Sequence, residues 1–400
     1  MKKRKILIAT CSILVVLAVV IGIVLWRNVD VKAKYADANA KILGEFTAKT
    51  ASELLNEEKE NICYSPASLI SALIMSAELT DEEAAQEICK AFDVKDVDEL
   101  EEVYSQMLDK IQVSEKTELN LGNSLWVDAN IIKDSDTQII SNCQEKLGCE
   151  IFERNGINGR EINSWVSKLT NGMINEVVDG NVDSPVILAN ALYFKSNWAD
   201  SFKDVKDDAF YLEDGETIEV PYIRCKEETM RYVEDKDYTM VKVSLEDGDM
   251  YFVLPTKNKS LSEVITEKNL NEFMALSTND KMDRGVVTIS IPNFEYDYDS
   301  GNEIESVIKK YGINKVFDVE QWLIGDCTEL DTVKIGQKTS VAVDKNGIEA
   351  AAATKVEVAY IGKEKEKEEE LVITFDRPFM YILMKEGVPL FIGTVYNPAE

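Results

Sequence analysis

Hydrophobic residues recur with two different periods along the chain. Over residues 35–147 they lie three and four positions apart, as in Ala38, Ile42 and Phe46, which predicts amphipathic helices, and another helix is predicted at 163–174. Beyond residue 185 the pattern changes to short apolar runs typical of strands, at 186–194, 250–254, 286–291, 371–375, 380–384 and 390–395. Because no internal repeat and no Pro- or Ser-rich linker interrupts the chain, we expect a single α+β domain.

The N-terminus has a pattern of its own. Residues 6–26 form an uncharged apolar run of 21 residues behind the basic cluster Lys2-Lys3-Arg4-Lys5. A helix of that length spans roughly 30 Å, the thickness of the apolar part of a bilayer. A cleavable signal usually has a shorter apolar core, of about 7–15 residues, with a small-x-small site close behind it. We therefore expect a membrane anchor at 1–27 that places residues 28–400 outside the cell, with a secreted form as the alternative.

Composition excludes several classes of function. The chain of 400 residues has 44 basic and 73 acidic side chains, a formal net charge of −29 and no histidine. An acidic surface repels nucleic-acid phosphates, so no nucleic-acid partner is expected. Without histidine there is no Ser-His-Asp or Cys-His catalysis and no His-based zinc site. Since no P-loop, GxGxxG or GxSxG motif occurs either, we expect neither an enzyme nor a bound cofactor or metal.

Two further features have a plain structural interpretation. The cysteines outside the apolar segment lack CxxC spacing, and a domain of this size needs no disulfides, which favours buried free thiols over pairing. They are Cys63, Cys89, Cys143, Cys149, Cys225 and Cys327. The run Asp297-Tyr298-Asp299-Ser300-Gly301 resembles a calcium-binding loop, but its glycine comes at the fifth position instead of the sixth. A solvated loop is therefore the favoured interpretation.

The segment 347–362 has four consecutive alanines in front of a strict alternation. With period two, one of its faces carries no charge and could be buried in a sheet; it consists of Ile348, Ala350, Ala352, Thr354, Val356, Val358 and Tyr360. The Lys/Glu run at 363–370 that follows must be solvated. Two interpretations fit: a strand able to insert into a sheet beside an exposed, cleavable tip, or an ordinary strand followed by a charged loop.

This segment resembles the reactive-loop hinge of the serpins, and further matches follow in that family's order along the chain. They are Asn61 with Ser65-Pro66-Ala67-Ser68, Ile162-Asn163-Ser164-Trp165-Val166 with Thr170 and Ile174, Asn190-Ala191-Leu192-Tyr193-Phe194-Lys195-Ser196-Asn197-Trp198 with Phe202, Phe375-Asp376-Arg377-Pro378-Phe379, and Pro389-Leu390-Phe391-Ile392-Gly393 with Asn397-Pro398. The run from Asn190 to Trp198 is the most specific. Together the matches cover residues 35–400.

The resemblance implies a fold and an activity. The fold would be a serpin-like single α+β domain with a large central mixed sheet, further sheets, about eight or nine helices and an exposed reactive loop at about 345–371. The activity would be suicide-substrate inhibition of extracellular serine proteases: the protease acylates itself on the loop, and the cut loop inserts as a new strand. The partner would be that protease, held covalently by a monomeric inhibitor. We also expect a serpin of prokaryotic type.

The family pattern also implies the residues of the site. The hinge would be Gly347, Ile348, Glu349, Ala350, Ala351, Ala352, Ala353 and Thr354. Counting 14 positions from the hinge glycine places the cleaved bond at Ile361–Gly362, which suits an elastase-like pocket. The neighbouring bond, Tyr360–Ile361, would suit a chymotrypsin-like one. A sheet-opening region is implied at Ser65, Asn190, Trp198 and Gln337.

Three residues depart from the family pattern. Lys345 stands where Glu is usual, Ile348 where Thr or Ser is typical, and Gln337 where a histidine commonly helps to latch the sheet; glutamine can still donate and accept hydrogen bonds there. The small, uncharged hinge favours an inhibitor over a non-inhibitory serpin that acts as a binding or storage protein. Inhibition of cysteine proteases, which use the same acylation step, stays open.

Overall fold

A computed structural model of the chain describes residues 34–57, 59–133, 137–178, 182, 186–278, 281–324, 335, 337–348 and 370–400. The chain divides into two units, Met1–Lys34 and Tyr35–Glu400, and the elements named below belong to the second. The segment expected to be a membrane anchor lies outside the described residues. Within the described ranges, no helix combines the length and the apolar character needed to cross a membrane.

Nine α-helices lie in the described part of the chain. They are α2 (Ala38–Glu57), α3 (Pro66–Leu79), α4 (Glu82–Ala91), α5 (Val97–Lys110), α6 (Thr137–Leu147), α7 (Gly159–Leu169), α8 (Leu261–Val264), α9 (Glu267–Ser277) and α10 (Glu303–Lys310). Helix α3 is buried almost all round, as expected for a helix that is apolar on every face. Its start is fixed by Ser65, whose side chain caps the helix by accepting a hydrogen bond from the Ser68 N–H, and by Pro66 in the first turn.

Most strands form a nine-stranded sheet with the order β1-β15-β14-β8-β7-β6-β9-β13, to which β5 adds by pairing with β6. Their bounds are β1 Ile62–Tyr64, β5 Lys203–Tyr211, β6 Thr217–Glu234, β7 Tyr238–Ser244, β8 Asp249–Pro255, β9 Asp283–Pro292, β13 Leu371–Thr374, β14 Phe379–Lys385 and β15 Val388–Val395. Strands β14 and β15 are buried at every position, so the centre of the core lies there.

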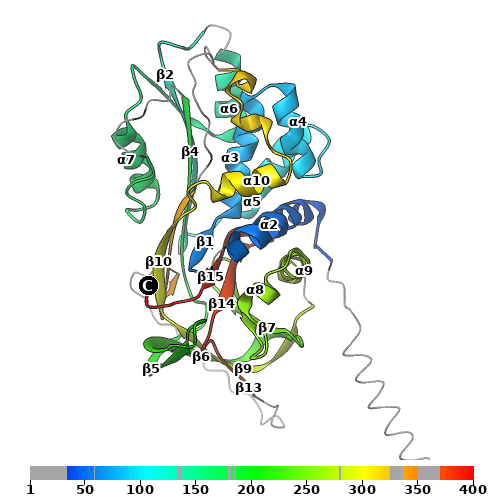
Figure 1. Cartoon of the computed structure of the whole chain (residues 1–400), viewed down its shortest axis with the longest axis vertical. Coiled ribbons are helices and arrows are strands. Elements are labelled where there is room, and N and C mark those ends of the chain that lie inside the picture. Colours follow the sequence, from blue (N-terminus) through cyan, green and yellow to red (C-terminus); the bar gives the residue numbers. More distant parts are fainter. Residues whose placement is uncertain are drawn as a thin grey trace, which may run out of the picture. The chain divides into compact units, whose positions relative to one another are not determined.

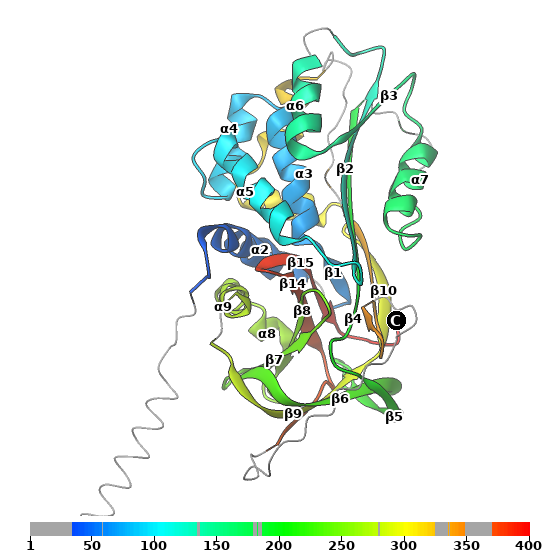
Figure 2. The same ribbon diagram turned by 180° about the vertical axis from the view of Figure 1, so that it is seen from behind.

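The second sheet has six strands in the order β10-β11-β12-β4-β2-β3. They are β2 (Glu118–Asp128), β3 (Glu150–Arg154), β4 (Val186–Asn197), β10 (Phe294–Asp299), β11 (Lys338–Val343) and β12 (Gly347–Ile348). The sheet is mixed, because β2 and β3 are parallel whereas β2 and β4 are antiparallel. Helix α7 lies on one face and the helices α3–α6 on the other (Figures 1 and 2). The expected α+β domain with a large mixed sheet, further sheets and eight or nine helices is confirmed.

Three local predictions differ from the structure. Strand β2 lies inside the stretch predicted to be mainly helical, because it pairs with β4 over ten consecutive residues that are distant in sequence. Residues 297–301, for which a solvated loop was the favoured interpretation, begin within strand β10. In this strand Phe294, Tyr296 and Tyr298 are buried on one face, and acidic residues alternate with them on the other. The helix expected at 163–174 is α7, which starts earlier because Asn158 caps it.

The thiols agree with the sequence prediction where they are described. Cys63, Cys89, Cys143, Cys149 and Cys225 are buried and unpaired. Burial raises the pKa of Cys63 to about 11 and of Cys225 to about 12, so both stay protonated at neutral pH. They therefore behave as small apolar core residues.

Candidate functional site

The six-stranded sheet is interrupted between β4 and β11. Both strands are antiparallel to β12, so they run parallel to each other. Gly347 pairs with Asn197, and Ile348 pairs with Ser196 on one side and Val343 on the other. In the described part of the chain only this two-residue strand joins them. Since β4 has 12 residues and β11 has six, most of each facing edge has no strand partner among the described residues.

A tight turn holds β12 at one end of this gap. The Asp344 N–H donates to the Gly347 carbonyl at 3.1 Å, and the Asp344 side chain accepts from the N–H groups of Asn346 (2.8 Å) and Gly347 (3.2 Å). Trp198 fixes the turn from the side of β4, because its indole N–H donates to the Asp344 carbonyl at 2.7 Å. Lys345, which stands where the family pattern has glutamate, is exposed and forms an ion pair with Asp204 of β5.

The hinge glycine is required by the close approach of two backbones. A Cβ atom added to Gly347 would lie 2.1 Å from the Ser196 carbonyl oxygen, a distance that no side chain tolerates. Ile348 is only 4% exposed, and its register partners Ser196 and Val343 are each 2% exposed. Because paired residues share a face, the Ile348 side chain points into the core, in agreement with the uncharged face assigned from the sequence.

A largely apolar cavity continues the gap beyond Ile348. Its volume is about 20 Å³, room for about one water molecule. Leu192 and Phe194 of β4 and Val341 of β11 line its two walls, and Tyr381 and Phe391 of the nine-stranded sheet lie beneath. The cavity therefore occupies the position where a strand between β4 and β11 would run.

At the other end of the gap, Gln337 is bonded to the start of α3. Its Oε1 accepts from the Ser65 N–H at 2.7 Å, and its Nε2 donates to the Ser65 carbonyl at 2.9 Å. The Ser65 hydroxyl in turn donates to the Leu390 carbonyl at 2.9 Å. Glutamine thus supplies both a donor and an acceptor at the position where the family pattern has histidine.

Asn190 belongs to the same polar cluster through other residues. It accepts a hydrogen bond from the Ser68 hydroxyl, and its Nδ2 donates to Asn123 Oδ1 at 2.5 Å. The Asn123 side chain donates to the Tyr104 hydroxyl at 2.7 Å. Burial raises the pKa of Tyr104 to about 12, so every member of this cluster is uncharged at neutral pH. Asn123 escaped the sequence analysis, because only its pairing opposite Asn190 in β2 brings it there.

The structure therefore divides the four residues implied as the sheet-opening region. Ser65, Asn190 and Gln337 belong to the polar cluster at the first turn of α3, whereas Trp198 lies at the opposite end of the gap beside β12. Of the implied hinge, Gly347 and Ile348 are described. Residues 349–354, the candidate cleaved bonds at 360–362 and the Lys/Glu run up to residue 369 lie outside the described residues.

Where the chain is described again, Glu370 is bonded to the nine-stranded sheet. Its carboxylate accepts hydrogen bonds from Lys226 Nζ at 2.8 Å and from the Thr288 hydroxyl at 2.6 Å. These contacts lower the pKa of the Glu370 carboxyl. The downstream end of the candidate loop is thus attached to β6 and β9, separately from the hinge.

Comparison with solved structures agrees with this architecture. Serpin48 of the insect Tenebrio molitor superposes with a TM-score of 0.75 at 23% sequence identity, covering 90% of this chain and 98% of that one. Human thyroxine-binding globulin, solved in complex with its hormone, superposes with a TM-score of 0.74 at 21% identity, covering 91% and 100% of the two chains. At these identities the likeness shows the fold alone.

Sequence comparison identifies the family. Serpin-ZX of Arabidopsis thaliana is 27% identical over 366 residues, which is 85% of this chain and 93% of the plant protein. The family model described as Serpin (serine protease inhibitor) matches residues 41–398. Neither these relatives nor the described helices support the expected prokaryotic type or the expected membrane anchor. The match spans nearly the whole chain, and the protein belongs to the serpin family, whose members are generally protease inhibitors.

Proposed function

We propose that this serpin is a suicide-substrate inhibitor of extracellular serine proteases with elastase- or chymotrypsin-like pockets. One observation carries the proposal: β12, which consists of the first two residues of the implied hinge, already pairs with both walls of the gap. Extending β12 needs no change of register. Because β12 is antiparallel to both walls, each further residue of the segment would pair with the preceding residue of β4 and the preceding residue of β11.

This register gives each inserting residue a partner. Glu349 would lie opposite Lys195, and Val358 would lie opposite Val186 at the far end of β4. Thr354 would lie between Asn190 and Gln337, the residues of the polar cluster at α3. A hydroxyl side chain is suited to that position, because both neighbours carry groups that can donate and accept.

The alanines match the cavity in the same register. Ala350 would lie between Phe194 and Val341, and Ala352 between Leu192 and Thr339. These neighbours are buried, so the inserting side chains must be uncharged and small. The sequence run Ala350-Ala351-Ala352-Ala353 satisfies both requirements.

The new pairing is sufficient to drive the reaction. Ten further residues would pair with β4, and five with β11, counting from Glu349 to the ends of those strands. At about 1 kcal/mol net per hydrogen bond, the gain is on the order of 10 kcal/mol. That is comparable with the stability of a whole domain, roughly 5–15 kcal/mol. Cutting the loop frees its upstream end to enter the gap.

The chemistry is supplied by the target. Its nucleophile attacks the Ile361 carbonyl, the Gly362 amine leaves, and an acyl-enzyme forms on residue 361. The hinge then carries the attached protease as it enters the gap, while the contacts of Glu370 retain the downstream fragment on β6 and β9. A β-branched aliphatic residue before the cut suits an elastase-like pocket; cutting at Tyr360–Ile361 would suit a chymotrypsin-like one.

We also propose that residues 1–27 anchor the inhibitor in the cell membrane with residues 28–400 outside. The support is the apolar run of 21 residues behind four basic ones. Fractionation of expressing cells with N-terminal sequencing tests it. Protein recovered from the medium with a new N-terminus near residue 27 contradicts the anchor and favours the secreted alternative.

A protease panel tests the inhibitory function. Incubation with elastase-like and chymotrypsin-like enzymes should give a covalent complex that resists denaturant. After denaturation, mass spectrometry of the freed C-terminal fragment should find Gly362 or Ile361 at its N-terminus. Complexes with cysteine proteases alone would reassign the target class. Clean cleavage without any complex would favour the non-inhibitory binding alternative and contradict the proposal.

A further inference from the structure

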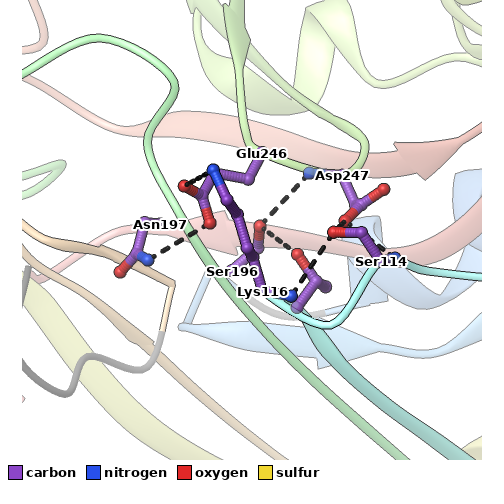
Figure 3. A network of polar contacts seen from close by, with 7 residues as sticks. Ser114, Lys116, Ser196, Asn197, Glu246 and Asp247 are labelled. Atoms are coloured by element: carbon purple, nitrogen blue, oxygen red, sulfur yellow. Dashed lines mark hydrogen bonds and ion pairs between the residues drawn. The ribbon is translucent and has the colours of Figure 1, made fainter. Parts of the chain in front are cut away.

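The end of β4 beside the hinge is bonded to a polar network that joins the two sheets (Figure 3). Ser196, directly opposite Ile348, is 2% exposed. Its hydroxyl shares a hydrogen bond of 2.9 Å with the Thr117 hydroxyl and accepts one of 3.4 Å from the Asp247 N–H. Asp247 lies in the turn between β7 and β8, so these bonds connect β4 to the nine-stranded sheet.

The Asp247 carboxylate is the centre of the network. It accepts hydrogen bonds from the Ser114 N–H at 3.1 Å and the Ser114 hydroxyl at 2.5 Å, and it lies 3.4 Å from Lys385 Nζ. The side chains of Asp247 and Lys385 are only 13% and 10% exposed, so water screens this ion pair poorly. Burial raises the pKa of Asp247, but the bonds from Ser114 and Thr117 and the Lys385 charge outweigh it and keep the carboxyl ionised.

Backbone bonds attach the following residues of the chain to the same turn. The Glu246 N–H donates to the Asn197 carbonyl at 3.0 Å, and the Ala199 N–H donates to the Ser244 carbonyl at 2.9 Å. The Glu246 side chain adds longer contacts with Asn197 Nδ2 at 3.4 Å and with Lys116 Nζ at 3.5 Å (Figure 3). The wall of the gap is thus fixed where an inserting strand would make its first contacts.

We propose that Asp247 is a positioning residue for loop insertion: its carboxylate fixes the β7–β8 turn through Ser114 and Lys385, and the main-chain N–H groups of that turn hold the hinge end of β4, so that the gap beside β11 stays open to an extending β12. The inference rests on the proposed function. Glu349 and Ala350 must pair with the β4 residues next to Ser196. If this end of β4 moves away, it has to return to its position before insertion can begin. Insertion slows, the acyl-enzyme has longer to hydrolyse, and more inhibitor is consumed as an ordinary substrate.

Asp247→Asn tests this, with Asp249→Asn as the matched control. Asp249 lies on the same hairpin and has a comparable ion pair, 2.7 Å from Lys242 Nζ, but Lys242 and its other partner Ser244 lie on β7. We expect Asp247→Asn to slow insertion about ten-fold, the effect of losing one charge-assisted hydrogen bond, and to raise the number of inhibitor molecules consumed per protease trapped. Asp249→Asn should match the wild type.

The insertion rate is measured without trapping, so that the two proposals fail separately. A metalloprotease, which forms no acyl-enzyme, cuts the loop, and insertion is followed as the growing fraction that resists urea; urea unfolding of the uncut variants identifies a mere loss of stability. Ser196→Ala removes the bonds of the Ser196 hydroxyl to Asp247 and Thr117 while leaving the Asp247–Lys385 pair and the main-chain bonds of the turn, and it replaces Asp247→Asn if that variant does not fold. It should slow insertion as well.

The outcomes are distinct. Equal insertion rates in the wild type and in the Asp247 or Ser196 variants overturn the positioning role, and so does equal slowing by Asp249→Asn. If the wild type traps no protease, the inhibitory function fails, and the insertion rates after metalloprotease cleavage still decide the role of Asp247. No insertion in the cleaved wild type overturns both proposals.

Discussion

At the residue scale, the gap constrains side chains by which face of the inserted strand they occupy. Ile348 shows which face of the strand points inward, because its buried side chain lies on the same face as Ser196 and Val343. Residues an even number of positions after it belong to the same inward face, whereas Glu349 belongs to the outward one. A charge is therefore excluded from one face and tolerated on the other.

Ala352→Arg should convert the inhibitor into a substrate. Arginine at this position would meet Leu192 and Thr339 in the proposed register, and an unpaired buried charge costs several kcal/mol. We expect the yield of covalent complex to fall at least about ten-fold while loop cleavage continues, measured on denaturing gels. Glu349→Arg, which places the same side chain on the outward face, is the control. Unchanged trapping by Ala352→Arg would show that residue 352 does not lie on the inward face of the inserted strand.

Gln337→Met should destabilise the uncleaved protein. The substitution keeps the length of the side chain but removes both hydrogen bonds to the Ser65 backbone, at 2.7 and 2.9 Å. We expect a loss of about 1–3 kcal/mol in the free energy of unfolding, measured in urea. A stability equal to the wild type in Gln337→Met would mean that this contact contributes nothing to holding the sheet.

At the element scale, the junction of helices α3, α5 and α6 contains a carboxyl group that titrates near neutral pH. Glu78 in the last turn of α3 meets Glu101 of α5, which forms an ion pair of 2.6 Å with Lys146 of α6. Burial, followed by the hydrogen bond and charge of Glu101, raises the pKa of Glu78 to about 7. The polar cluster at the gap contains no such group, because glutamine, asparagine and serine do not titrate and burial raises the pKa of Tyr104 to about 12.

The three-helix junction should make stability depend on pH. In the folded protein Glu78 holds its proton up to about pH 7, whereas in the unfolded chain it releases it near its ordinary value. Unfolding then releases a proton, so stability should fall as the pH rises from about 5 to 7 and level off above. Urea unfolding of Glu78→Gln should show a flatter profile and higher stability at pH 8. Glu102→Gln on the exposed side of α5 is the control, and a wild-type slope in Glu78→Gln contradicts the assignment.

At the scale of the whole molecule, the six-stranded sheet lacks most of one strand among the residues that the structure describes. Its two walls are fixed at the ends: by Gln337 and Asn190 at the start of α3, and by Trp198 and Asp247 beside the hinge. Between those ends the facing edges of β4 and β11 have few strand partners among the described residues, and a narrow cavity of about 20 Å³ lies there. Filling the gap adds both hydrogen bonds and apolar contacts, so the cut form should be the more stable one.

Cleavage of the loop should therefore raise the melting temperature. A gain on the order of 10 kcal/mol, divided by the unfolding entropy of a domain of this size, corresponds to a rise of about 10 °C or more. Calorimetry before and after cutting with a metalloprotease measures it. Ala352→Arg, cut in the same way, should show little of the rise, and an unchanged melting temperature in the cut wild type would argue for a non-inhibitory serpin.

The sequence by itself determined the fold class and the family, because these depend on periodicity and on short runs such as Asn190 to Trp198. It also determined which face of the hinge is uncharged, a property of neighbouring residues. Strand β2 was not predicted, since pairing with the distant strand β4 overrides the helical pattern expected around it. Strand β10 was missed although its aromatic and acidic residues alternate with period two. Only the tertiary structure decided the register of β12, the contact of Gln337 with Ser65 and the contact of Asp247 with Ser196. Those residues are 272 and 51 positions apart, and no local pattern encodes which distant groups meet.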